Sequence, residues 1–162
     1  MRSRYRIHEP DAAHFITSTI TEWLPVFTSA ACCDVLIRSF DHCRQHKCLR
    51  IHAWVILDNH FHAIVSGLEL ADTIRDFKRF TARMLLAQLQ EERREWLLNQ
   101  LSYFRAAHRK AVAAHHVWQE AGVSARQPGE AGMVASPEHW RYSSAHEGMA
   151  GTCPVLRCDP WR

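Results

Sequence analysis

Two histidines separated by a single residue, His60 and His62, are the side chains best placed for chemistry. They begin an apolar, β-branched segment that indicates a strand over 60–66. Alternate side chains of a strand share a face, so both imidazoles project from one face, about 7 Å apart along the chain. Because imidazole nitrogen is a common ligand for metals, the two rings can converge on one cation, although this spacing alone is more often found in pairs without metal. A hydrogen-bonded or solvated pair without metal is the alternative.

A hairpin must position these histidines. A strand over 50–57 precedes them, and Asp58 and Asn59 predict a two-residue turn because both tolerate the positive φ angles of tight hairpin turns. The residues alternating with the histidines are apolar, so we expect them to face a layer of helices and the histidines to lie on the open face. These apolar residues are Phe61, Ala63 and Val65.

The remaining chain predicts further elements. A strand is expected over 14–21, then a helix over 30–46 with Ser29 as its N-cap. Asp72 is expected to cap a second helix starting near Thr73. A third helical region runs from Trp96 toward His116, after a break at 91–94. The order predicts an α+β fold, a ferredoxin-like sandwich whose mainly antiparallel sheet has helices packed on it. Beyond these, the sequence predicts a loop over 122–132, a helix start at 136–140 and an irregular tail over 148–162.

Composition restricts the class of protein. The 162 residues fit one domain, and 47% hydrophobic residues suffice for a core. No apolar run approaches the length of a membrane span, and no signal core follows the basic N-terminus, so we expect a cytoplasmic protein. The net charge of +3 permits nucleic-acid binding without requiring it. Six cysteines are expected to be reduced thiols. A zinc site within 42–48 is the less favoured alternative.

The hairpin sequence resembles that of a known family. Residues 53–65 are similar to the hairpin of the REP-associated branch of the single-tyrosine HUH transposases, in which two histidines flank a hydrophobic residue. Five further segments resemble family landmarks in the same order, so that the resemblance covers most of residues 4–146. These segments are 14–17 with 25–27, the basic helix 77–83, 117–120, 132–134 and 140–145.

The resemblance implies cleavage and rejoining of single-stranded or hairpin-forming DNA in transposition. His60 and His62 would hold a divalent cation, magnesium or manganese, that polarises the scissile phosphate. A tyrosine hydroxyl would attack and form a covalent phosphotyrosine. Family members occur as monomers and as dimers.

The tyrosine segment of the family has no match here. In the family it lies between the Trp-Gln and Gly-Leu-Val landmarks, whereas here Trp118-Gln119 is followed closely by Gly132 with no tyrosine between. We therefore expect a transposase-like domain over 1–147, internally truncated around 120–132. Tyr103, in a helix without the flanking motif, is only a weak candidate for the nucleophile. A non-catalytic DNA-binding remnant is the alternative function, so enzymatic activity is left open.

A basic stripe provides the candidate DNA contacts. Three arginines spaced four residues apart share one face of the predicted second helix, with a lysine beside them. Such a stripe binds phosphates in a salt-dependent way, and a solvated helix face is the alternative. These residues are Arg75, Lys78, Arg79 and Arg83.

Overall fold

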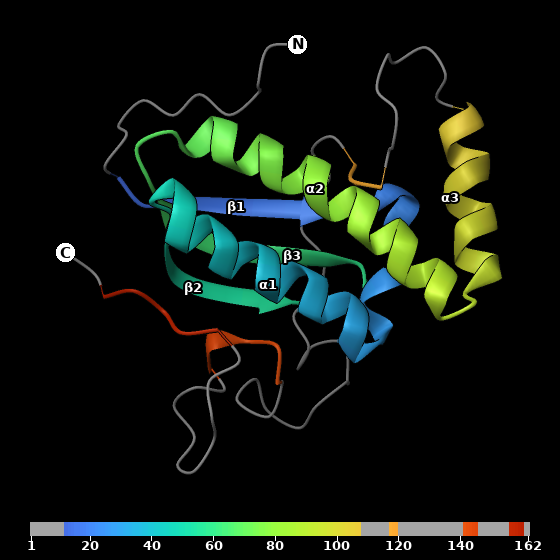
Figure 1. Ribbon diagram of the computed structural model, residues 1–162, viewed down its shortest axis with the longest axis horizontal. Coiled ribbons are helices and arrows are strands. Elements are labelled where there is room, and N and C mark those ends of the chain that lie inside the picture. The colour runs from blue at the N-terminus through green and yellow to red at the C-terminus, as the bar shows by residue number, and fades with distance from the viewer. Residues whose placement is uncertain (1–11, 108–116, 120–140, 146–155, 161–162) are drawn as a thin grey trace.

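The fold is built from three strands and three main helices (Figure 1). The computed structural model describes residues 12–107, 117–119, 141–145 and 156–160. The strands are β1 (His14–Thr19), β2 (Arg50–Ile56) and β3 (His60–Ser66). The helices are α1 (Ala30–Lys47), α2 (Leu70–Glu91) and α3 (Glu95–Ala107), and two short 3-10 helices, η1 (Thr21–Trp23) and η2 (Val26–Thr28), precede α1.

The sheet has the order β1-β3-β2, and β3 pairs antiparallel with both neighbours. Because β3 is inserted between β1 and β2, the unit β1-α1-β2 is a split βαβ unit, the arrangement found in ferredoxin-like folds. The predicted α+β fold with an antiparallel sheet is confirmed.

Segments from late in the chain extend the sheet at both edges. Trp118 forms an antiparallel bridge with Ile20 beside β1, and the Gln119 amide donates to the Thr19 carbonyl at 2.7 Å. At the other edge Ser143 bridges Val55 of β2. The two segments that resemble late family landmarks therefore flank opposite edges of the same sheet.

Helices α1 and α2 cover one face of the sheet (Figure 1). Phe61 of β3 is fully buried beneath them and packs edge-on against Phe40 of α1 at 5.3 Å and against Phe77 of α2 at 5.7 Å, both between ring centroids. Trp118 contacts Phe61 from the same side at 5.5 Å. The prediction that Phe61 and its alternating neighbours face the helices is confirmed, and this aromatic cluster forms the centre of the core.

The helix boundaries follow local chemistry. Ser29 caps α1 as predicted, since its hydroxyl accepts from the Cys32 amide at 3.2 Å. The predicted break after α2 is also confirmed: α2 ends at Glu91 and α3 starts at Glu95. The predicted Asp72 cap is wrong, because α2 starts at Leu70 and Asp72 lies within its first turn. A carboxylate there is favoured by the helix dipole and needs no capping geometry.

The hairpin turn differs from the expected geometry. The Leu57 amide donates to the His60 carbonyl at 2.8 Å, which encloses the predicted two-residue loop. Neither Asp58 nor Asn59 has a positive φ, so that expectation is wrong. Their carbonyls accept from the amides of Phe27 and Ile20, both at 2.8 Å. These bonds from the segment after β1 hold the loop without a left-handed turn.

Some predicted segments lie outside the described residues: the helical stretch 108–116, the loop 122–132 and the helix start at 136–140. Of the predicted tail, residues 156–160 are neither helix nor strand, and Asp159 accepts from the Ile51 amide at 2.9 Å. No single described helix is long and apolar enough to cross a membrane. The pair Thr21–Thr28 and Ala30–Lys47 passes such a test by length and composition only, and is bent by 99°.

Candidate metal centre

His60 and His62 lie at the start of β3, on the face opposite the helices. The register pairs His60 with Thr19 and His62 with Thr17 of β1. The imidazole centroids are 4.8 Å apart and the rings stand at 76° to each other. The strand geometry that the sequence predicts therefore brings the two rings together on one face.

The predicted open face is wrong at these two residues. His60 is only 1% exposed and His62 only 4%. Phe15 of β1 stacks on the His62 ring at 5.3 Å, and Trp23 of η1 approaches the His60 ring edge-on at 6.1 Å. The sequence pattern of β3 alone does not reveal these neighbours, because they belong to a segment that pairs with β3 only in the folded chain.

The Nδ1 atom of His60 is held by Asn59. Its distance to the Asn59 Oδ1 is 2.6 Å. The Asn59 Nδ2 donates to the Trp23 carbonyl at 3.3 Å, so the amide oxygen faces His60. A carbonyl oxygen only accepts, and therefore the proton of neutral His60 sits on Nδ1 and its Nε2 carries a free lone pair.

The Nδ1 atom of His62 lies 2.8 Å from the Thr17 hydroxyl. A hydroxyl both donates and accepts, so this contact is compatible with the same tautomer, in which Nε2 is left as the basic atom. A hydrogen bond at one ring nitrogen that orients the other toward a cation is the usual arrangement around metal-binding histidines.

Both Nε2 atoms are buried and have no hydrogen-bond partner. Leaving a buried polar atom unsatisfied costs about 1–3 kcal/mol, and the same cost arises here twice on adjacent rings. A divalent cation bound by the two lone pairs would remove both costs. The residues present therefore fit a metal ion.

Electrostatics favour the neutral imidazoles that metal binding requires. Burial, together with the nearby His62, lowers the pKa of His60 to about 4, and burial lowers the pKa of His62. Neutral rings offer lone pairs without competition from protons near pH 7. Among the described residues no group of three His, Cys, Asp or Glu side chains surrounds a common point, so the histidines are a two-nitrogen site within that residue set.

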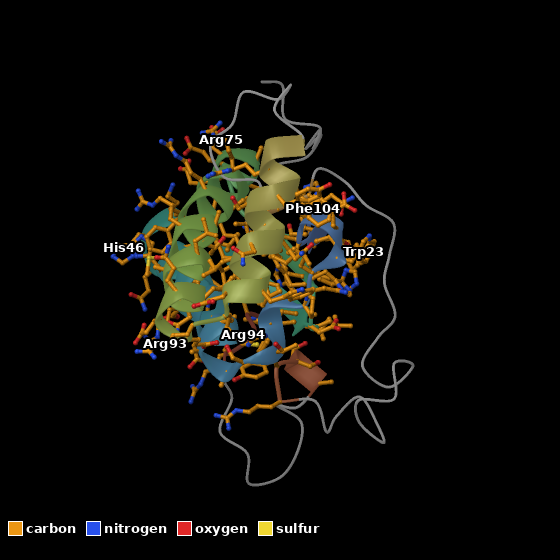
Figure 2. The ribbon with its side chains drawn as sticks, turned by 90° about the vertical axis from the view of Figure 1, so that its right-hand side faces the viewer. Trp23, His46, Arg75, Arg93, Arg94 and Phe104 are labelled. Carbon is orange, nitrogen blue, oxygen red and sulfur yellow. The ribbon has the colours of Figure 1, made fainter. Side chains whose placement is uncertain are left out.

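The predicted DNA-binding residues do not join this centre. They lie on α2, which covers the opposite face of the sheet, and Figure 2 shows Arg75 near the top of the molecule and Trp23 at its right-hand edge. Arg75 also forms ion pairs with Asp72 and Asp76, which reduce its field. Arg79 and Arg83 are exposed and make no salt bridge with any described residue, while Lys78 is half-buried.

Among the described residues, no hydrogen bond or ring contact joins Tyr103 or Tyr142 to the histidine pair. Tyr103 is 67% exposed on α3, and its ring contacts Phe104. Tyr142 lies at the outer edge of β2, where its carbonyl accepts from the Ile56 amide at 2.8 Å. Burial and the nearby α1 residues Cys33 and Asp34 raise the pKa of Tyr142, which locates its phenol on the helix side of the sheet. Tyr5 lies outside the described residues.

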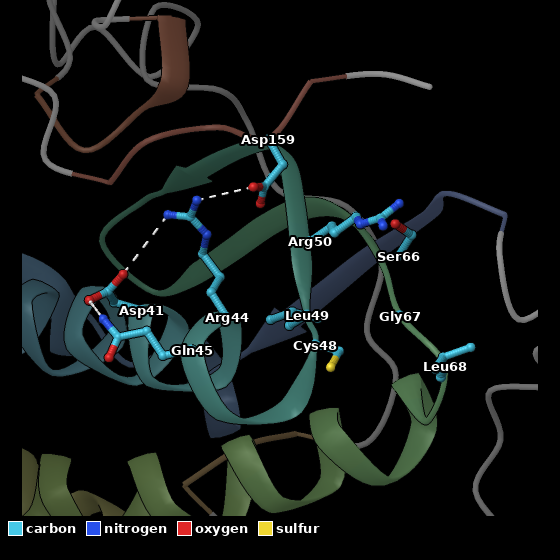
Figure 3. A pocket seen from close by; sticks show the side chains of 10 residues that line it. All are labelled: Asp41, Arg44, Gln45, Cys48, Leu49, Arg50, Ser66, Gly67, Leu68 and Asp159. Carbon is cyan, nitrogen blue, oxygen red and sulfur yellow. Dashed lines mark hydrogen bonds and ion pairs between the residues drawn. The ribbon is translucent and has the colours of Figure 1, made fainter.

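A hollow of about 630 Å³ lies at the far end of β3 from the histidines (Figure 3). It is bordered by the end of α1 and the start of β2, and an ion pair between Arg44 and Asp159 at 3.1 Å crosses its wall. Ser66 lines the hollow, and the rise of six strand residues places Ser66 about 20 Å from His60. The four side chains of the alternative zinc site do not point to one place. Cys48 is exposed and lines this hollow, whereas Cys43 is buried, and His42 stacks on His46 on the exposed side of α1. The less favoured zinc site within 42–48 is not formed by these described residues.

Comparison with known proteins agrees with this architecture. No family model and no curated protein matches the sequence. A solved structure of a REP-associated tyrosine transposase bound to a REP hairpin matches with a TM-score of 0.59 and 14% sequence identity. The match covers 99% of this chain and 93% of that chain. The present chain therefore has the fold of a REP-associated tyrosine transposase.

Proposed function

We propose that this chain is a DNA-binding protein of the HUH class, which binds single-stranded or hairpin DNA and holds a divalent cation between His60 and His62. The observation that carries the proposal is the pair of adjacent imidazoles with buried, unpartnered Nε2 atoms. The fold supports it, because the transposase of the same fold is bound to a REP hairpin.

Magnesium and manganese are the expected ions. Imidazole suits manganese better than magnesium, which prefers oxygen ligands and keeps several waters. When bound, the ion polarises a phosphate oxygen and neutralises the charge that develops during strand cleavage. The chain's own residues orient the rings: Asn59 fixes the tautomer of His60, and Thr17 holds His62.

The histidine face also offers a surface for an unpaired base. Phe15 is 64% exposed although it stacks on His62. Stacking between a base and an aromatic ring contributes about 1–3 kcal/mol and does not depend on sequence. We therefore place the single-stranded part of the DNA across Phe15, beside the two histidines.

Two activities are compatible with this site. Strand cleavage and rejoining requires a nucleophile at the cation, and in the described residues no hydrogen bond or ring contact joins Tyr103 or Tyr142 to the histidines. That observation favours a DNA-binding protein without transesterase activity as the second candidate. In both cases the metal and the single strand share one face of the sheet.

The test is incubation of the full chain with hairpin oligonucleotides carrying a single-stranded overhang, with manganese, followed by a denaturing gel. Nitrocellulose-filter retention measures binding in parallel, and His60→Ala is the control. A covalent protein–DNA band that requires His60 establishes the transesterase. Retention without a covalent band establishes the binding protein. Absence of both in the wild type overturns the proposal.

A further inference from the structure

The histidine face carries a third unsatisfied atom, contributed by a residue far along the chain. The side-chain oxygen Oε1 of Gln119 is buried and has no hydrogen-bond partner, as is true of the Nε2 atoms of His60 and His62. Buried amide oxygens are nearly always paired. An unpaired one on the same face of the sheet as two unpaired imidazole nitrogens points to a shared ligand.

The backbone pairing determines the direction of the Gln119 side chain. Trp118 bridges Ile20, the Gln119 amide donates to the Thr19 carbonyl, and the Thr21 amide donates to the Val117 carbonyl. This pattern puts Gln119 directly opposite Thr19 in an antiparallel pair, and opposite residues share a face.

Trp118 provides an independent check on that face. Its ring packs on Phe61, and its Nε1 donates to the Thr81 hydroxyl of α2 at 3.1 Å, so Trp118 points to the helix side. Neighbouring residues of an extended segment alternate, which directs Gln119 to the other side. Both arguments agree.

The register then brings Gln119 and His60 toward each other. Thr19 is opposite Gln119 on one side and opposite His60 on the other, so all three share a face. Neighbouring strands lie about 4.8 Å apart, and the Gln119 and His60 backbones are therefore about 10 Å apart. Both have long side chains, and the short Thr19 between them leaves room for these to converge.

We infer that Gln119 Oε1 is the third protein ligand of the cation held by His60 and His62. This inference rests on the proposed metal site and adds an oxygen donor to its two nitrogens. An amide oxygen is a hard ligand that suits manganese and magnesium. The donor set of two imidazoles and one carbonyl oxygen favours those ions more than two imidazoles alone.

The experiment is a titration of the metal-free full chain with Mn²⁺, in which the electron paramagnetic resonance signal of the free ion reports binding. Gln119→Ala is expected to raise the dissociation constant about tenfold, near the lower end of the loss seen when a residue that orients a metal ligand is changed. Gln119→Glu is expected to lower it below the wild-type value, because a carboxylate adds negative charge. Gln45→Ala, an exposed glutamine on α1, is the matched control.

The outcomes separate the inference from the proposed function. If Gln119→Ala binds Mn²⁺ as the wild type does while His60→Ala does not, Gln119 is not a ligand and the histidine site stands. If the wild type binds no better than His60→Ala, the proposed metal site itself fails. Far-UV circular dichroism establishes that each variant is folded. Should Gln119→Ala not fold, Gln119→Glu decides, and a failure to tighten binding overturns the inference.

Discussion

The most informative single residue beside the histidines is Asn59, which the sequence presents only as a turn former. Its Oδ1 accepts a hydrogen bond from His60 Nδ1 and its Nδ2 donates to the Trp23 carbonyl, so Asn59 links the hairpin turn to η1. The hairpin turn and the proposed metal ligand His60 are therefore joined by hydrogen bonds of one side chain. The choice of Asn59 here is explained by the tautomer of His60, since the turn itself does not need a residue with positive φ.

Replacing Asn59 tests this role. Asn59→Ala removes the acceptor that fixes the Nδ1 proton, so His60 gains the alternative tautomer with its proton on Nε2. We expect Mn²⁺ affinity to fall about 10- to 100-fold, the range found when such orienting residues are lost. Calorimetric titration with Mn²⁺ measures the affinity, and Asn99→Ala, at an exposed position on α3, is the control. Unchanged affinity in Asn59→Ala would contradict the role.

Cysteine reactivity is a second property of single residues. Burial, together with the nearby Cys32 and Asp34, raises the pKa of Cys33 to about 12, whereas Cys48 is exposed. Because the thiolate is the reactive form, we expect Cys33 to react slowly in the folded chain at pH 8. The folded state holds the Cys33 proton more tightly than the unfolded chain does. The stability that results is fully present below the usual pKa of 9.0 and is lost as the pH rises from there toward about 12.

Iodoacetamide labelling followed by peptide mass spectrometry checks this prediction. At pH 8 we expect Cys48 to be labelled within minutes and the peptide carrying Cys32 and Cys33 to remain unlabelled until guanidinium is added. Equal labelling rates for the two peptides in the native protein would show that the environment of Cys33 is open.

At the scale of elements, local signals predict well and pairing between distant segments does not. The hairpin follows from alternation in β3, and α1 follows from its apolar spacing and from Ser29. The sequence predicts the start of α2 near Thr73 rather than at Leu70, because an aspartate is favoured both as an N-cap and within the first turn of a helix. The sequence of β3 does not predict that Phe15, Trp23 and Gln119 lie on the histidine face. Which segments pair with β3 depends on strand order, and the periodicity of β3 does not encode that order.

Helix α2 permits a prediction about electrostatics. Arg79 and Arg83 are exposed without salt bridges to described residues, whereas Arg75 is paired with two carboxylates. The double substitution of Arg79 and Arg83 by Ala should weaken single-stranded DNA binding and reduce the slope of log K against log salt by about 1.4. Arg75→Ala, whose charge is already compensated, should have a smaller effect. Fluorescence anisotropy at several salt concentrations measures both.

This prediction also tests the far face of the sheet. Since α2 and the histidines lie on opposite sides, DNA that contacts both has to pass around an edge of the sheet. If the double variant binds with the wild-type salt dependence, the stripe is a solvated helix face and the DNA is confined to the histidine side.

For the whole molecule, the sheet separates the aromatic core from the face that carries the proposed site. The helix face holds the buried aromatic cluster of Phe40, Phe61 and Phe77, together with the buried, unpartnered hydroxyl of Ser18, which lies opposite Phe61. The opposite face holds polar atoms that are buried without partners, together with the exposed Phe15. A fold that leaves such atoms unsatisfied forgoes stability on that face, as proteins commonly do at functional sites.

Two substitutions of the same residue type distinguish the faces. Phe61→Ala removes a ring that is 0% exposed and contacts both helices, so it should cost about 3–5 kcal/mol of unfolding free energy. Phe15→Ala removes a ring that is 64% exposed and should cost much less.

The order is reversed for DNA binding. At a temperature where both variants are folded, Phe15→Ala should weaken binding to a single strand, while Phe61→Ala leaves the affinity near the wild-type value. Urea unfolding and anisotropy measure the two quantities. Loss of DNA binding in step with loss of stability would mean that the faces are not independent, and that the histidine face is held in shape by the aromatic core beneath it.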